Sequence, residues 1–308
     1  MQPVNKARLQ IHFCVLLWGF TAILGKLISL PALSLVWWRM LMVTGALLLM
    51  PRVWRGLRAM SMRVRLAYAG IGVLVSLHWL TFYAAIKLAN ASVGATCIAL
   101  GPAFLTFVEP WLTRRRFDVR EVLMALAVVP GVAMVAGGVP DHMRLGIAVG
   151  VLSALFVALF GALNKRMVEH GDPLTVTCIE LGTGTLFLTA LAPLLPHPGP
   201  TYPLPGMHDT LLLLLLAFGC TLLPFTLVLV ALRHVSAFAT QMITNLEPVY
   251  AIVLAMLLLG EQHQLDSWFY LGVVVILAAV FAHPLLHRKD PAQIQPELLG
   301  TAESHNLD

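Results

Sequence analysis

Long apolar segments constrain the fold of this chain more than any other feature. A helix that rises 1.5 Å per residue needs about 20 residues to cross about 30 Å of hydrocarbon. The strands of an outer-membrane barrel would instead appear as segments of about ten residues with alternating polarity. The apolar segments of this chain lie near residues 9–30, 33–51, 66–86, 91–112, 120–138, 146–164, 174–195, 209–231, 236–259 and 267–286. We therefore expect an all-α membrane protein with ten transmembrane helices.

The composition favours the same class of protein. Charged residues make up 11% of the 308 residues and hydrophobic residues 59%, whereas soluble domains contain about 25% charged residues. The first apolar segment is too long for a signal-peptide core and carries Lys26, so we expect a retained span. The four cysteines are far apart within apolar segments. Their spacing predicts free thiols rather than a metal site or a disulfide framework.

Positive charges indicate the orientation, because Lys and Arg accumulate in cytoplasmic loops. With the N-terminus inside, 16 of the 20 Lys and Arg residues fall in cytoplasmic segments, and only Lys87 and Arg144 fall in outer loops. We expect a multi-pass protein of the cell inner membrane with both termini in the cytoplasm. These loops explain the net charge of +5, so the charge predicts no nucleic-acid partner.

The chain contains an internal repeat. Residues 85–105 (AIKLANASVGATCIALGPAFL) align without a gap on residues 231–251 (ALRHVSAFATQMITNLEPVYA), and this alignment places Pro102 on Pro248. A more approximate match sets LLWGFTAILGK of the first span beside ALFVALFGALNK of the sixth. The repeating unit is thus five spans, and an odd number inverts the second copy in the membrane. Inverted repeats usually enclose a site near the bilayer midplane and allow alternating access.

We predict three regions from this repeat: residues 1–140 and 141–288 as two inverted five-helix repeats, and residues 289–308 as a disordered cytoplasmic tail. Gly146 and Gly150 begin a series of small residues in the sixth span, which predicts close helix packing inside the bundle. The alternative for this series is a dimer face. We expect a monomer or a homodimer that lies in the lipid bilayer.

Ionisable residues inside the spans are the main candidates for function. Each costs roughly 2.5–3.5 kcal/mol at the centre of a span, so it needs a partner, a wet cavity or a task. They are Lys26 and Arg39 in the outer half of the membrane, Glu109 and Glu180 in the inner half, and His78 and Glu247 near the middle. We predict a cavity with a cationic outer part and an anionic inner part, which fits a zwitterion. The alternative is that Lys26 or Arg39 forms a salt bridge with a glutamate and does not touch substrate.

The ninth span places a proline beside a carboxylate. At 100° per residue, one stripe holds Thr240, Thr244 and Glu247, and the adjacent stripe holds Gln241, Asn245 and Pro248. Pro248 cannot donate a backbone hydrogen bond and crowds the carbonyl of Thr244, so we predict a kink at Glu247. A freed carbonyl beside a carboxylate at the midplane indicates a ligand or proton site. The alternative is a proline kink whose glutamate is capped by a neighbouring hydroxyl or amide.

The other candidates are polar or aromatic residues in or near the spans. Candidates for substrate binding are Trp18, Lys26, Arg39, His78, Trp79, Tyr83, Asn90, Gln241, Asn245 and Tyr250, and candidates for proton coupling or gating are Glu247, Pro248, Glu180 and Glu109. His78 is a proton relay or a hydrogen-bonded packing residue. The aromatic residues line the cavity or act as interfacial anchors. Asn90 binds substrate or caps the helix that follows it.

Several segments resemble a known family. WGFTAILGK in the first span, WWR in the second, AIKLANAS before the fourth, and ALRHVSAFAT with NLEPVYAIVLAMLLLGE in the ninth are similar to the EamA family of the drug/metabolite transporter superfamily. The similarity extends from about residue 9 to residue 286. It implies two five-helix halves that form a carrier opening alternately inward and outward, and it implies export of amino acids or other metabolites. The segment HWLTFY in the third span and the pair Glu109 and Pro110 depart from the commoner pattern of the family.

The motifs HExxH, GxSxG and GxxxxGK[ST] do not occur at a sensible place in the sequence, so we expect no metal, no cofactor and no ATP hydrolysis. Energy would then come from an ion gradient or from exchange, and the membrane carboxylates favour protons. We predict a secondary transporter, not an enzyme, that exports a small polar or zwitterionic, amino-acid-like metabolite. Two alternatives stay open. One is a carrier for organic anions or nucleotide-type solutes, and the other is a membrane enzyme for a lipid-linked substrate with His78 and a glutamate as acid and base.

Overall fold

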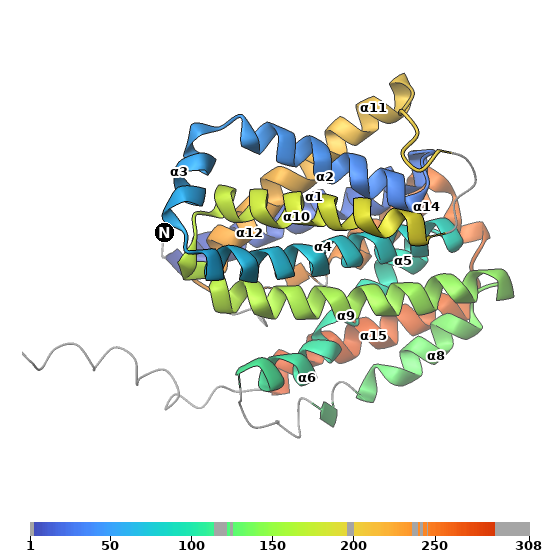
Figure 1. Ribbon diagram of the computed structural model, residues 1–308. Helices are drawn as coiled ribbons and strands as arrows, with labels where there is room; N and C mark the ends of the chain where they lie inside the picture. The colour runs from blue at the N-terminus through green and yellow to red at the C-terminus, as the bar shows by residue number, and fades with distance from the viewer. Residues whose placement is uncertain are drawn as a thin grey trace, which may run out of the picture.

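The computed structural model describes residues 3–113, 122–123, 126–195, 200–235, 240, 243–244 and 246–286. Every segment of regular secondary structure in these residues is a helix (Figure 1). The helices up to residue 137 are α1 (Pro3–Leu27), α2 (Ala32–Leu48), α3 (Pro51–Ala59), α4 (Met62–Leu88), α5 (Ala91–Ile98), α6 (Gly101–Thr113) and α8 (Val129–Gly137). The all-α class is therefore confirmed for the described chain.

The second part of the chain is built in the same way. Its α-helices are α9 (Arg144–Met167), α10 (Pro173–Leu191), α11 (Met207–Leu214), α12 (Leu223–Ala231), α14 (Glu247–Leu259) and α15 (Ser267–Leu286). Short 3-10 helices are η1 (Asp141–Met143), η2 (Val168–His170), η3 (Ala192–Leu194) and η5 (Glu261–His263), and η4 (Leu215–Leu222) is a π-helix between α11 and α12. The predicted tail, residues 289–308, lies outside the described residues.

Six helices among the described residues are long and apolar enough to cross a membrane, or seven if the bent pair of α2 and α3 is one span. Two shorter apolar helices, Glu247–Leu259 and Ser267–Ala279, add to these. Each of the ten predicted spans contains helical residues. The expected number of ten spanning helices nevertheless stays a prediction, because length and composition support only six or seven in the described chain.

Helix α3 is an element that the sequence did not predict. It follows α2 after a bend of 88° and begins with Pro51, a residue that suits the first turn of a helix. Val53 is buried, whereas Trp54, Arg55 and Arg58 are exposed. This amphipathic pattern is typical of a helix that lies across the end of a bundle rather than within it.

Helix starts follow the local sequence closely. The side chains of Ser61, Asn90 and Asp172 accept hydrogen bonds from the backbone N–H three residues later, at the starts of α4, α5 and α10. These N-caps satisfy donors that a helix start leaves open. At the C-terminus of α14, Gly260 ends the helix with φ of 64°, a left-handed conformation that glycine adopts without strain.

The two halves pack against each other as antiparallel partners. Helix α4 packs on α9, and α1 packs on α12, so the third helix of one five-span unit contacts the first helix of the other in both directions. Helices α2 and α10 run antiparallel, because Arg52 beyond the end of α2 contacts Asp172 before α10, while Trp37 near the start of α2 contacts Thr189 near the end of α10. This arrangement is the one that inverted copies produce.

The proline alignment between the two copies is visible in the helices. Gly101 and Pro102 are the first two residues of α6, and the aligned Glu247 and Pro248 are the first two residues of α14. Proline suits this position because it has no N–H to leave unpaired. The chain therefore breaks its helix at the same point in both repeats, and the second break lies at Glu247.

We name the two ends of the bundle by the helices that mark them in Figure 1. The α3 end contains α3, the start of α1 and the turn from η2 to α10, and the α11 end contains the start of α11, the start of α5 and η5. Under the predicted orientation, the α3 end faces the cytoplasm.

Candidate functional site

A cavity lies in the middle of the helix bundle and includes about 1010 Å³ of space between protein atoms, its open mouth counted. Its lining comes from both halves of the chain. Its polar lining residues are Thr21, Arg39, His78, Asn164, Thr221, Thr240, Thr244 and Glu247, and its aromatic lining residues are Trp18, Trp79, Phe82, Phe160 and Phe225. A mostly apolar cavity with a few convergent polar groups is typical of a small-molecule site.

Arg39 is the basic side chain in the described lining and is held firmly. It is 2% exposed. Its Nε donates to Thr221 Oγ1 at 2.5 Å, its Nη1 donates to Tyr83 Oη at 2.8 Å, and its Cζ lies 3.8 Å above the ring centre of Trp79. The remaining guanidinium N–H groups have no described protein partner. Because a guanidinium carries five N–H donors, the fixed Arg39 can still bind an anionic group in the cavity.

Glu247 lies in the first turn of α14 and is 8% exposed. It lines the cavity together with Thr240 and Thr244, as the predicted stripe required. No hydrogen bond or ion pair joins its carboxylate to another described residue, although Glu247 and Arg39 are close enough to interact electrostatically. The cavity thus contains one guanidinium and one carboxylate that do not bind each other directly. Such an arrangement leaves both groups available to a ligand.

His78 is fixed by α9 rather than by another titratable group. Its Nδ1 lies 3.0 Å from the carbonyl oxygen of Ser153 and 2.8 Å from Ser153 Oγ, and Ser153 Oγ donates to the His78 carbonyl. A carbonyl only accepts hydrogen bonds, so Nδ1 carries a hydrogen in this arrangement. The ring also packs near Phe82 and Phe160. Of the two roles considered, the geometry supports a hydrogen-bonded packing residue at the cavity wall.

Two further candidates, Trp18 and Trp79, also line the cavity. Tyr83 lies behind the lining, where it accepts the hydrogen bond from Arg39 and is fully buried. Pro248 is buried as the second residue of α14. These residues form the wall and the support of the site rather than its charged centre.

Other candidates lie away from the cavity lining. Lys26 is exposed in the last turn of α1, and Tyr250 is 39% exposed and packs its Cβ against Gly19. Asn90 is buried but caps α5 through Val93 N. Of the two cations predicted for the outer part of the cavity, only Arg39 therefore lies in the described lining, because Lys26 is exposed at the end of α1.

The acidic candidates of the inner half also lie outside the lining. Glu109 is half-buried in α6, close enough to Lys165 to interact electrostatically. Glu180 is fully buried in α10, and its Oε2 lies 3.5 Å from Nδ2 of Asn164, which does line the cavity. Gln241 and Asn245, two predicted substrate-binding residues, lie outside the described residues.

Sequence reasoning missed the residues that complete the site. Thr221 belongs to the π-helix η4 and accepts the hydrogen bond from Arg39 Nε. Asn164 lies in the segment ALFGALNK, which the sequence presents as part of the internal repeat. A polar amide within an apolar span was a usable signal for Asn164, whereas a π-turn has no comparable sequence signal.

Hydrogen bonds between the two halves close the bundle at the α11 end. Glu261 accepts from Ala91 N at 3.0 Å, from Ser92 N at 2.9 Å and from Ser92 Oγ at 2.7 Å. Asp209 accepts from the backbone and the hydroxyl of Ser29. The cavity lining instead extends toward the α3 end, through Asn164 and Leu232.

Comparison with known families gives two matches along the chain. A model described as the EamA-like transporter family matches residues 6–137 and residues 144–282. The two matches cover most of the chain.

Two relatives with curated names are transporters. Phosphoenolpyruvate/phosphate translocator 2, chloroplastic, from Arabidopsis thaliana is 29% identical over 174 residues, which are 56% of this chain and 44% of that protein. The match thus spans less than half of the translocator's length. An uncharacterized transporter from Clostridium kluyveri is 22% identical over 249 residues, which are 76% of this chain and 78% of that protein.

The fold also occurs in a protein of known crystal structure. The superposition has a TM-score of 0.63 at 17% sequence identity and covers 92% of this chain and 99% of the other. At this identity the likeness concerns the fold alone.

Proposed function

Because this chain belongs to the EamA-like transporter family and is a multi-pass membrane protein, we propose that it exports a small zwitterionic, amino-acid-like metabolite across the cell inner membrane by alternating access. In this proposal the chain is a secondary transporter that uses the proton gradient. Both curated relatives are transporters, which points away from the alternative of an enzyme for lipid-linked substrates.

One observation carries the proposal: Arg39 and Glu247 line the same buried cavity without binding each other. Arg39 offers free N–H groups to a carboxylate, and Glu247 offers oxygens to an ammonium group. A charge-assisted hydrogen bond is about twice as strong as a neutral one. A zwitterion satisfies both groups at once, whereas an ion of either sign would leave one of them without a partner in a low-dielectric site.

The rest of the lining favours an apolar side chain on that zwitterion. Trp79 and Phe225 make an edge-to-face contact at 6.1 Å between ring centres, and Phe82 and Phe160 flank His78 on the same lining. Such walls bind hydrocarbon or aromatic groups through burial. We therefore choose phenylalanine as the first probe.

Transport of the bound molecule would follow from the antiparallel halves. The contacts of Glu261 and Asp209 at the α11 end join the two halves across the closed side, while the cavity extends toward the α3 end. Rocking of one half against the other would break the first set of contacts and open the α11 end. With the α3 end in the cytoplasm, the described conformation would receive substrate for export.

A second candidate is a carrier for organic anions, because one relative is a phosphoenolpyruvate/phosphate translocator. The described lining argues against this substrate class here. Arg39 is accompanied by Glu247 in the same cavity, so a phosphate group that approached Arg39 would also meet a carboxylate. The two candidates therefore predict opposite effects of removing the charge of Glu247.

A ligand screen of the purified protein tests the proposal. A ligand that binds only the folded state raises the midpoint of thermal unfolding, so amino acids, organic acids, phosphoenolpyruvate and nucleotides are compared at equal concentration. We expect phenylalanine and similar zwitterions to stabilise the wild-type protein and to have no effect on Arg39→Gln.

Transport in proteoliposomes then tests the coupling. A pH gradient should drive uptake of phenylalanine, and uptake should fall to exchange alone when the gradient is collapsed. Stabilisation by phosphoenolpyruvate but by no amino acid would reject a zwitterionic substrate. Uptake at the same rate with and without the pH gradient would reject proton coupling.

A further inference from the structure

Glu180 is a fully buried carboxyl group with almost no partner. Its Oε2 is 3.5 Å from Asn164 Nδ2, at the limit of a hydrogen bond, and its Oε1 has no partner among the described residues. Asn164 Oδ1 is also without a partner in this part of the chain. Buried polar atoms are nearly always hydrogen-bonded, so two neighbouring residues with unpartnered oxygens need an explanation.

Charged or titratable groups on the elements that pack against α10 have other partners. Tyr68 of α4 donates to Met167 O, Arg39 of α2 binds Thr221 and Tyr83, Arg52 of α3 binds Asp172, and Arg233 after α12 donates to Gly171 O. Glu169 of η2 is exposed. Within the described chain, no basic group forms an ion pair with Glu180. An ionised carboxylate at this place would therefore be uncompensated and costly.

A proton bound to Glu180 removes the uncompensated charge. A protonated carboxyl group has an O–H donor, and the amide of Asn164 presents its oxygen to that donor when it is turned by 180° about its last bond. The hydrogen on Glu180 Oε2 is then donated to Asn164 Oδ1, so the amide oxygen gains a partner, and the neutral carboxyl group costs less to bury than a carboxylate. A hard metal cation would require about six or more oxygen ligands, and Glu180 and Asn164 together offer far fewer.

A second pocket leads from Asn164 toward the α3 end. It includes about 190 Å³ of space between atoms, its open mouth counted, and its lining includes Tyr68, Asn164, Gly171, Pro173, Val176 and Leu229. Pro173, Val176 and Glu180 lie on one face of α10 at spacings of three and four residues. Glu180 therefore lies one turn beyond Val176 and adjoins the pocket through Asn164, which lines it, while Glu180 itself is not part of the lining. Asn164 and Leu229 line both the pocket and the central cavity.

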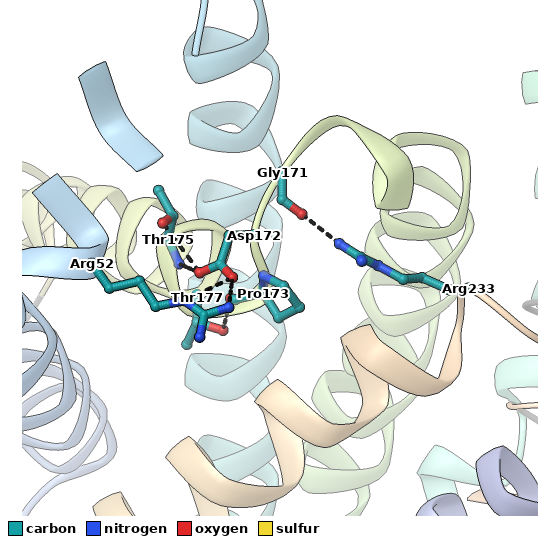
Figure 2. Close-up of polar contacts among 7 residues, drawn as sticks. All are labelled: Arg52, Gly171, Asp172, Pro173, Thr175, Thr177 and Arg233. Carbon is teal, nitrogen blue, oxygen red and sulfur yellow. Dashed lines mark hydrogen bonds and ion pairs between the residues drawn. The ribbon is translucent and has the colours of Figure 1, made fainter. Parts of the chain in front are cut away.

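The outer rim of the pocket is the turn from Gly171 to Pro173, which Figure 2 shows clamped from two sides. Arg52 of α3 binds Asp172 at 2.5 Å, and Arg233 donates to the carbonyl of Gly171 at 2.8 Å. The turn itself is half-buried, whereas Asn164 at the other end is 3% exposed. The pocket thus connects a fixed surface turn with Asn164 of the buried polar pair.

We propose that Glu180 and Asn164 form a proton-binding site that is reached from the α3 end through this second pocket, and that Glu180 rather than Glu247 carries the coupled proton. Proton and substrate then use separate routes and meet at Asn164. The coupling role rests on the proposed export function, whereas the bound proton and its route of access do not.

Infrared spectroscopy of the full-length protein in lipid tests the site without a substrate. The carbonyl stretching band of a protonated buried carboxyl group should be present near neutral pH in the wild type, absent in Glu180→Gln and retained in Glu247→Gln. A band that persists in Glu180→Gln would overturn the proposal. A band that disappears when sodium chloride replaces potassium chloride would overturn it in favour of a sodium site.

Exchange in deuterium oxide tests the route. Val176→Phe narrows the pocket and should slow the deuterium shift of the band, while Val176→Ala widens it and should accelerate the shift. The alanine variant keeps the test valid if the phenylalanine variant does not fold. Equal rates in Val176→Ala and the wild type would overturn the route.

Transport separates this proposal from the proposed function. Glu180→Gln should lose uptake of phenylalanine driven by a pH gradient but keep exchange of phenylalanine, and retained gradient-driven uptake would overturn the coupling role. A wild-type protein that binds no zwitterion would reject the proposed function, and the infrared results on Glu180 would stand independently.

Discussion

Two glutamates of this chain are equally buried and differ completely in their surroundings. Glu261 is 1% exposed and Glu180 is 0% exposed. Glu261 accepts three hydrogen bonds from Ala91 and Ser92 at the start of α5, whereas Glu180 has one contact at 3.5 Å. Burial alone therefore does not indicate the role of an ionisable group in a membrane bundle.

The difference follows from helix ends. The first N–H groups of α5 have no partner within their own helix and carry partial positive charge, so they hold the carboxyl oxygens of Glu261 in place. Glu180 lies in the middle of α10, where every backbone N–H is already used by the helix. The first glutamate is thus a structural link between the halves, and the second is free to gain and lose a proton.

The largest expected effect is a loss of stability when Glu261 is replaced. Glu261→Ala leaves the N–H groups of Ala91 and Ser92 without acceptors in a buried place, and we expect it to lower the free energy of unfolding by about 3 kcal/mol. The midpoint of thermal unfolding, measured by tryptophan fluorescence, checks this. Glu169→Ala, which removes an exposed glutamate of η2, is the matched control and should change the midpoint little. Equal midpoints for both variants would contradict the structural role of Glu261.

A smaller effect is expected at the third buried glutamate, which faces the cavity. Glu247→Gln removes the partner of the substrate ammonium group, and we expect the affinity for phenylalanine to fall about tenfold, or about 1.4 kcal/mol. Isothermal titration calorimetry measures the change. The affinity for 3-phenylpropionate, which has no amino group, should not fall.

Lys26→Gln is the control for the cavity, because Lys26 is exposed at the end of α1. It should leave the affinity for phenylalanine unchanged. A larger loss of affinity for phenylalanine in Lys26→Gln than in Glu247→Gln would instead place the ligand near Lys26, in the outer part of the cavity that the sequence predicted.

Much of the fold was predictable because it depends on local physics. Apolar length placed helical residues in all ten predicted spans, and Pro248 predicted a kink at Glu247, the residue at which α14 begins. Helix α3 was not predicted, because a short basic connection gives no long apolar signal. Its helical character depends on burying Val53 against the bundle, which is a tertiary contact.

The site was less predictable, because its contacts join residues far apart in the sequence. The stripe of Thr240, Thr244 and Glu247 follows from helical periodicity alone and lines the cavity. The pairing of Arg39 with Thr221 depends on a π-turn and on the packing of two halves. In the sequence Glu261 stands out only as the end of a family motif, since its partners Ala91 and Ser92 lie 170 and 169 residues earlier.

The smallest expected effect is on the free energy of unfolding when Glu180 is replaced, and its sign is opposite to that for Glu261. Glu180→Leu replaces a poorly partnered carboxyl group by an apolar side chain of similar size, so the free energy of unfolding should stay equal or rise by up to about 1 kcal/mol. The thermal midpoint should therefore not fall, although gradient-driven uptake of phenylalanine should be lost. A fall comparable to that of Glu261→Ala would mean that Glu180 has a strong partner in the folded protein. In that case both glutamates would be structural, and the coupled proton would have to bind elsewhere.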